Sequence, residues 1–115
     1  MSTAAAQVFV KAANDPVCQS CISNLKATAK SGKVQLEWTR TNADHYNVYR
    51  GSVSAGPYVL IGTTKSTYSL YLDTTVTNGS TYFYVVREAA LNNNEYCQSN
   101  EAMATPLAPT LPPRR

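Results

Sequence analysis

The sequence predicts an all-β fold in which two antiparallel sheets pack as a sandwich. Short runs of alternating apolar and polar residues recur between residues 22 and 105, and the run 33–39 alternates without exception. Such alternation is typical of strands that bury one face in a core. The only tryptophan, Trp38, lies near the end of this run and precedes a Tyr-x-Val run that begins at Tyr46. With 115 residues, the chain can close one modest core around these side chains.

Four strands are expected in the first half of the sandwich. They cover residues 22–29, 33–39, 46–50 and 58–62. Residues that favour turns separate them, namely Ser31-Gly32, Thr41–Asp44 and Ala55-Gly56-Pro57. The order of runs and breaks therefore predicts consecutive antiparallel strands.

Three further strands complete a seven-stranded sandwich, over 67–72, 81–88 and 96–104. Asn78-Gly79 and Asn92–Asn94 provide the turns before the last two. Residues 1–21 then form an extended N-terminal arm, residues 22–105 the domain, and residues 106–115 a proline-rich tail. Four prolines between 106 and 113 favour an extended, polyproline-like tail.

Alternation also predicts which side chains face the core. The inward set is Leu36, Trp38, Tyr46, Val48, Leu70, Tyr82 and Tyr84, with Val34, Tyr68, Leu72 and Val86 on the same faces. Tyr49, Phe83, Val85 and Met103 point away from the core on the strands 46–50, 81–88 and 96–104, and are expected to lie together on one sheet face. Such a patch of aromatic and apolar groups fits a partner surface, and it equally fits ordinary cross-strand packing under the stems of Arg50 and Arg87.

Several segments together resemble a bacterial or phage fibronectin type III domain, which is immunoglobulin-like. The segments are Val34-x-Leu36-x-Trp38, Tyr46–Arg50, Gly56–Gly62, Leu72–Val86 and Ser99–Ala102. The resemblance implies seven strands in two sheets and no catalysis of the domain's own. It also implies that Tyr82 is a tyrosine-corner residue whose hydroxyl binds nearby backbone. The Arg-Gly-Asp adhesion motif of animal relatives is missing, because Arg50-Gly51 is followed by serine.

The three cysteines depart from the family pattern. In the topology that the resemblance implies, Cys18 and Cys21 precede the first strand at the end of the sandwich where Cys97 opens the last one. A disulfide from Cys97 to Cys18 or to Cys21 is then geometrically feasible. A zinc site of Cys18, Cys21, Cys97 and His45 is an alternative, as are free thiols; a redox role for Cys-x-x-Cys is disfavoured because no helical pattern surrounds it. We assign no metal and no cofactor.

Charge and composition favour binding over catalysis. The net charge is +3 and the Lys and Arg residues are scattered, which argues against a nucleic-acid partner. The sequence has no run of 18 apolar residues, so it predicts no segment that inserts into a membrane. Residues 1–13 lack the pattern of a secretory signal. The seven acidic residues fall in loops or at outward positions, without a pair that would share a cleft. We therefore expect a protein that is not an enzyme.

These observations lead to two functional hypotheses. The first is a structural and interaction module on a virion surface, of the decoration or cement type, whose termini dock on capsid or other protein subunits; an extended 16-residue arm reaches roughly 50 Å. The alternative is a spacer, or a surface- or carbohydrate-binding module, of a secreted bacterial enzyme or adhesin. Polysaccharide is a second partner class, since exposed aromatic side chains can stack on sugar rings.

Overall fold

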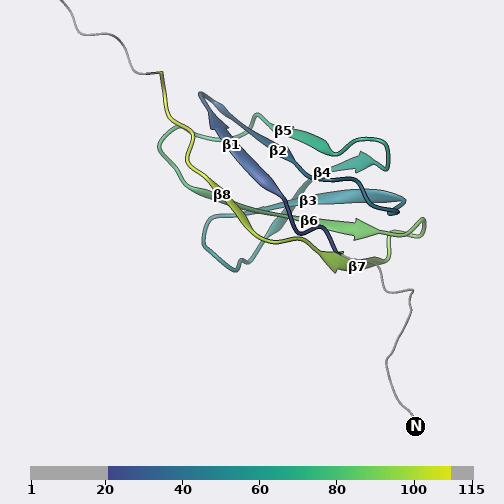
Figure 1. Cartoon of the computed structure of the whole chain (residues 1–115). Helices are drawn as coiled ribbons and strands as arrows, with labels where there is room; N and C mark the ends of the chain where they lie inside the picture. The colour runs from purple at the N-terminus through teal and green to yellow at the C-terminus, as the bar shows by residue number, and fades with distance from the viewer. Residues whose placement is uncertain (1–20, 110–115) are drawn as a thin grey trace, which may run out of the picture.

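A computed structural model describes residues 21–109 as two antiparallel sheets that face each other (Figure 1). The strands are β1 (Lys26–Lys30), β2 (Lys33–Glu37), β3 (His45–Gly51), β4 (Val59–Lys65), β5 (Leu70–Asp73), β6 (Tyr82–Ala89), β7 (Glu95–Gln98) and β8 (Ala102–Ala104). The smaller sheet has the order β1-β2-β5; the larger has the order β4-β3-β6-β7, with β8 also paired to β6. The predicted all-β sandwich is confirmed.

The last predicted strand, 96–104, is divided into β7 and β8. Both segments pair with β6, through Glu88↔Cys97 and Phe83↔Met103. At the break, the Ser99 hydroxyl accepts the backbone N–H of Val86 at 2.9 Å, and the Ser99 N–H donates to the Val86 carbonyl at 2.9 Å. The Ser99 side chain thus replaces one rung of backbone pairing, which is how the chain leaves and rejoins the same neighbour.

The first strand begins later than predicted. Residues 22–25 are not in a strand, although Ile22 and Leu25 are buried. Side chains of the larger sheet hold this segment: the Ile22 N–H donates to the Glu88 carboxylate at 3.1 Å. The amide of Asn100 accepts the Leu25 N–H at 2.9 Å and donates to the Leu25 carbonyl at 3.0 Å. Long-range polar contacts therefore take the place of strand pairing here.

The core lies between the sheets and contains most of the predicted side chains. Leu36, Tyr46, Val48 and Tyr84 are fully buried, Trp38 is nearly so, and Tyr82 is half-buried against them. The edge of the Tyr46 ring packs on Trp38, with centroids 5.4 Å apart. The clustering of these aromatic and aliphatic groups supplies the main hydrophobic stabilisation of the sandwich.

The prediction was wrong for β5, where Leu70 is 53% exposed and Leu72 is 45% exposed. Tyr68 is exposed as well, whereas Tyr71 and Asp73 face inward. The Tyr71 hydroxyl donates to the Ile61 carbonyl at 2.9 Å, which draws this ring between the sheets. A shift of one residue exchanges every side chain between the two faces of a strand, so the whole predicted set moves outward.

Asp73 links the two sheets through polar contacts. Its buried carboxylate accepts hydrogen bonds from the Arg50 guanidinium at 2.9 Å and from the Tyr84 hydroxyl at 2.8 Å. The hydroxyl and the backbone N–H of Thr75 also donate to it, at 2.7 and 3.0 Å. Burial raises the pKa of Asp73, but the hydrogen bonds from Thr75, Tyr84 and Arg50 outweigh burial, and the pKa lies below its usual value.

The loop between β5 and β6 contains the predicted tyrosine corner. The Tyr82 hydroxyl accepts the backbone N–H of Thr77 at 2.8 Å. The Arg50 guanidinium lies over the Tyr82 ring, 5.0 Å from its centre. The loop is thus fixed at both the hydroxyl and the ring of Tyr82, as the resemblance implied.

Candidate functional site

The outward face of the larger sheet brings together the four residues predicted to form a binding patch. Tyr49 pairs directly with Val85 across β3 and β6, and Phe83 pairs with Met103 across β6 and β8. Since Tyr46, Val48 and Tyr84 point into the core, these four side chains belong to the opposite face. The predicted juxtaposition therefore exists in the structure.

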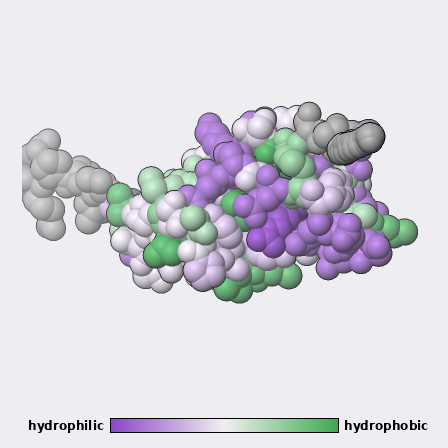
Figure 2. Space-filling model, turned by 90° about the horizontal axis from the view of Figure 1, so that it is seen from below, coloured by the Kyte–Doolittle hydropathy of each residue, from purple (hydrophilic) through white to green (hydrophobic). Residues whose placement is uncertain are grey.

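This face does not form the open apolar patch that we expected. Val85 is 1% exposed, Tyr49 and Phe83 are half-buried, and only Met103, at 62%, is largely exposed. The Arg87 guanidinium lies 4.2 Å from the centre of the Tyr49 ring and covers it. Viewed from below, the body has a hydrophilic middle with hydrophobic areas toward its margins (Figure 2). The face is better described as a polar layer over a small apolar floor.

Glu95, at the start of β7, organises the polar layer. Its carboxylate accepts the hydroxyl of Tyr49 at 2.5 Å and the amide of Asn47 at 2.7 Å, and it pairs with Arg87 at 3.2 Å. Burial raises the pKa of Glu95, but the hydrogen bonds from Tyr49, Asn47 and Arg87 lower it by more. The pKa of Glu95 therefore lies below its usual value. Burial, followed by the Glu95 contact, raises the pKa of Tyr49. Each polar group is thus occupied within the sheet.

The loop between β3 and β4 occupies the other end of this face. Glu101, in the break between β7 and β8, accepts the hydroxyls of Tyr58 and Ser54 and the backbone N–H of Ala55. The hydrogen bond from Tyr58 is the main reason why the pKa of Glu101 lies below its usual value. Because β3 and β8 pair with opposite sides of β6, the contact between Tyr58, in the loop after β3, and Glu101, just before β8, reaches across β6. Val85, in the same part of β6, is buried although it faces outward.

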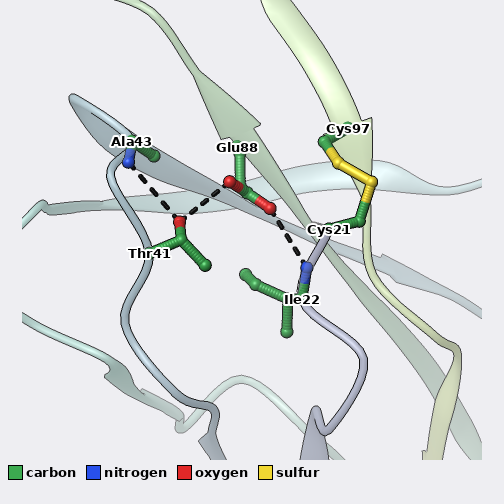
Figure 3. Close-up of a disulfide and its surroundings, with 6 residues drawn as sticks. All are labelled: Cys21, Ile22, Thr41, Ala43, Glu88 and Cys97. Atoms are coloured by element: carbon green, nitrogen blue, oxygen red, sulfur yellow. Dashed lines mark hydrogen bonds between the residues drawn. A yellow bond between two sulfur atoms is a disulfide. The ribbon is translucent and has the colours of Figure 1, made fainter. Parts of the chain in front are cut away.

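The cysteine end of the sandwich contains a disulfide between Cys21 and Cys97, with Cα atoms 5.5 Å apart (Figure 3). The predicted disulfide is confirmed, and Cys21 rather than Cys18 is the partner; Cys18 lies outside the described residues. Beside the bridge, the buried Glu88 carboxylate accepts the Ile22 N–H and the Thr41 hydroxyl, the latter at 2.8 Å (Figure 3). The bridge and Glu88 together fix the start of the described chain to the larger sheet.

Among the described residues, the structure does not bring His45 together with Cys21 and Cys97, as the zinc site would require. The sulfur atoms of Cys21 and Cys97 are joined to each other, and the third potential ligand near them is Glu88, not His45. His45 Nδ1 contacts Asp44 and Nε2 contacts Asn93, each at 2.8 Å. Cys97 pairs with Glu88, whereas His45 pairs with Ala89, the residue after Glu88. That offset places the imidazole on the opposite face of the sheet.

Sequence reasoning missed the carboxylates that bind within the fold. Asp73 and Glu88 are 2% and 1% exposed, although we expected every acidic residue in a loop or outward. For Glu88 the signal was present, since it continues the inward series of Tyr84 and Val86. The roles of Glu95 and Glu101 carried no local signal, because their tyrosine partners lie more than 40 residues away in the sequence.

The architecture and sequence have a close counterpart among solved proteins. An Fn3-like protein from Clostridium thermocellum is 34% identical to the chain, with a TM-score of 0.67. The match covers 82% of this chain and 97% of that one. This chain belongs to the fibronectin type III family. The resemblance proposed from the sequence is confirmed, although the chain matches no established family model.

The chain is also similar to short segments of larger enzymes. An amylopullulanase from Thermoanaerobacter thermohydrosulfuricus is 42% identical over 89 residues, which are 76% of this chain and 6% of that enzyme. The pectate lyase Pel3 from Pectobacterium carotovorum is 30% identical with a TM-score of 0.63, over 74% of this chain and 26% of that one. The chain therefore corresponds to a small part of these relatives. Among the described residues, no helix is long and apolar enough to cross a membrane.

Proposed function

We propose that this fibronectin type III domain is a spacer module of an extracellular enzyme that degrades polysaccharide. The observation that carries the proposal is the 42% identity to one short segment of an amylopullulanase. A second enzyme named for a polysaccharide, pectate lyase Pel3, contains a segment of the same fold. These relatives support the second of our sequence-based hypotheses, a spacer module of a secreted enzyme. The virion-surface hypothesis has no support among the relatives described above.

The positions of the chain ends fit a spacer. The described chain starts at Cys21, which is bonded to Cys97 beside Glu88, near the end of β6. It leaves after β8, where Ala104 pairs with Tyr82 at the start of β6. The two ends of the body are therefore separated by the length of β6, roughly 20 Å, and lie at opposite ends of the sandwich (Figure 1). A rigid body with this geometry holds flanking domains apart.

The disulfide supports the extracellular part of the proposal. Disulfides persist in oxidising compartments and are rare in the reducing cytosol of most bacteria. The Cys21–Cys97 bridge closes a separation of 76 residues and fixes the start of the body. Its contribution to stability is therefore available outside the cell, where a spacer of a secreted enzyme acts.

An antibody raised against the chain tests this function in the organism that encodes it. We expect the antibody to detect a polypeptide much longer than 115 residues in the culture medium, and this polypeptide to co-fractionate with polysaccharide-degrading activity. Detection only in regular protein particles without such activity would reject the spacer function and restore the virion hypothesis.

A further inference from the structure

Two hollows lie at the end of the smaller sheet where the chain enters β1. One hollow of about 290 Å³ is lined by Asn24, Lys26, Glu37, Trp38 and Thr39. A second hollow of about 270 Å³ lies between residues 21–24 and 39–41. Asn24 and Thr39 line both hollows, so the two are adjacent. We call this pair of hollows the entry groove. It exists because β1 starts at Lys26 and leaves the residues after β2 without a paired strand.

Hydrogen-bonding side chains line the entry groove. The Asn24 amide donates to the Thr39 hydroxyl at 2.6 Å and accepts the Thr39 N–H at 3.1 Å, which fixes both groups at the centre. Lys26 and Glu37 are direct cross-strand partners, yet no ion pair joins their side chains among residues 21–109. One cation, one anion, an amide and a hydroxyl therefore face the same space. This mixture of donors and acceptors suits a neutral polyhydroxylated ligand better than a highly charged one.

Exposed apolar side chains lie directly beside these polar groups. Leu70 pairs with Glu37, and the backbone N–H of Trp38 donates to the Ser69 carbonyl at 3.1 Å, so Tyr68 lies one residue before this contact in the sequence. Tyr68 is 61% exposed and Leu70 is 53% exposed. An exposed aromatic ring beside fixed hydrogen-bonding groups offers both surfaces that a sugar presents, since its C–H face packs on apolar groups and its hydroxyls bind polar ones.

Trp38 provides a further indication. It lines the first hollow and is 6% exposed, and its indole N–H is the one buried side-chain polar atom of the described residues without a hydrogen-bond partner. A buried donor without an acceptor is unfavourable. A ligand in the first hollow would lie against the Trp38 side chain, whose indole N–H has no hydrogen bond to lose.

We propose that the entry groove and the adjoining Tyr68 and Leu70 bind a segment of a neutral α-glucan chain. The choice of glucan rests on the proposed function, because a relative is named for pullulan. The site differs from the outward face of the larger sheet, where the aromatic rings of the predicted patch are covered. A spacer with this surface would keep the flanking domains of the enzyme apart. It would also hold the enzyme on its polysaccharide substrate.

Fluorescence of Trp38 tests the proposal with the full chain, because it is the only tryptophan and it lines the groove. Titration with pullulan oligosaccharides should give a saturable change in emission. Tyr68→Ala and Asn24→Ala should each weaken binding at least about tenfold, while Tyr68→Phe, which keeps the ring, should retain it within about threefold. Tyr96→Ala is the matched control, since Tyr96 is 43% exposed but lies on β7 of the other sheet.

The outcomes separate this site from the spacer function. Absence of a saturable change, unaltered affinity in Tyr68→Ala, or an equal loss in Tyr96→Ala would each overturn the glucan site. Binding of polygalacturonate but not pullulan would overturn its assignment to neutral glucan. Tyr68 is exposed, so its substitution leaves the fold intact even where Asn24→Ala unfolds the chain. A negative result here leaves co-fractionation of the native polypeptide with enzyme activity as an independent test of the spacer.

Discussion

At the scale of single residues, Asp73 shows how one buried carboxylate can join two sheets. Asp73→Asn removes the charge that holds Arg50 and accepts the Tyr84 hydroxyl. Hydrogen bonds to charged groups contribute about 1.5–3 kcal/mol each, so we expect the free energy of unfolding to fall by about 2–3 kcal/mol at pH 7. Urea unfolding followed by tryptophan fluorescence measures this loss. Asp44→Asn is the control, because the side chain of Asp44 is 43% exposed.

The same substitution alters the dependence of stability on pH. The pKa of Asp73 is lower in the fold than its ordinary value, so its contribution is present above about pH 4 and is lost as the pH falls through the folded pKa. The wild type should therefore lose more stability between pH 5 and pH 2 than Asp73→Asn loses. Parallel curves for the two proteins would mean that the Asp73 network does not favour the charged form.

Alternation in the sequence correctly located inward residues on β2, β3 and β6. It placed Leu36, Tyr46 and Tyr84 in the core, where each is fully buried. It did not anticipate Asp73 and Glu88, because a carboxylate is buried only when distant partners supply hydrogen bonds. The partners of Glu88 are Ile22 and Thr41, and those of Asp73 include Arg50 and Tyr84, so alternation within one strand does not reveal these bonds.

At the scale of elements, β5 shows why its register could not be read from its own residues. Leucine at 70 and 72 and tyrosine at 68 and 71 give both faces an apolar residue, so period two does not choose between them. The choice is made by β4, since the Tyr71 ring lies where a Cβ at Gly62 would be. Glycine at 62 and the inward Tyr71 therefore specify each other across the two sheets.

A double-mutant cycle tests this pairing of elements. Gly62→Ala should destabilise the wild type by about 1–3 kcal/mol, because the new methyl group collides with Tyr71. In a Tyr71→Ala background the same change should cost about 1 kcal/mol less, since the ring is gone. Thermal unfolding of the four proteins measures the coupling energy. A cost that is equal in both backgrounds would place Tyr71 away from Gly62.

The face predicted for binding illustrates the limit of the same method at this scale. Period two placed Tyr49, Phe83, Val85 and Met103 together, as the register has them. It could not give their exposure, which depends on Glu95 and on the loop that reaches Glu101. Likewise the division of 96–104 into two strands depends on Ser99 and its contact with Val86. Long-range side-chain contacts, rather than strand propensity, decide these features.

At the scale of the whole molecule, the disulfide determines how the chain is held at one end. A bridge across 76 residues stabilises by about 4 kcal/mol when the loss of chain entropy in the unfolded state is the main effect. It also joins Cys21, the first described residue, to Cys97 in β7. A pull on the N-terminal side therefore acts on β7 through the bridge and not on β1. A spacer is pulled from both ends, and this connection carries that pull into the larger sheet.

Mechanical unfolding of single molecules tests this arrangement. With the bridge intact, force on the two termini extends only residues outside the segment from Cys21 to Cys97. Reduction should release that segment and lengthen the fully unfolded chain by about 250 Å, given roughly 3.4 Å for each of its 76 residues. Cys97→Ser should give the longer extension without reductant, and Cys18→Ser should keep the shorter one. Equal lengths for oxidised and reduced wild type would show that the bridge does not form and that tension enters through β1.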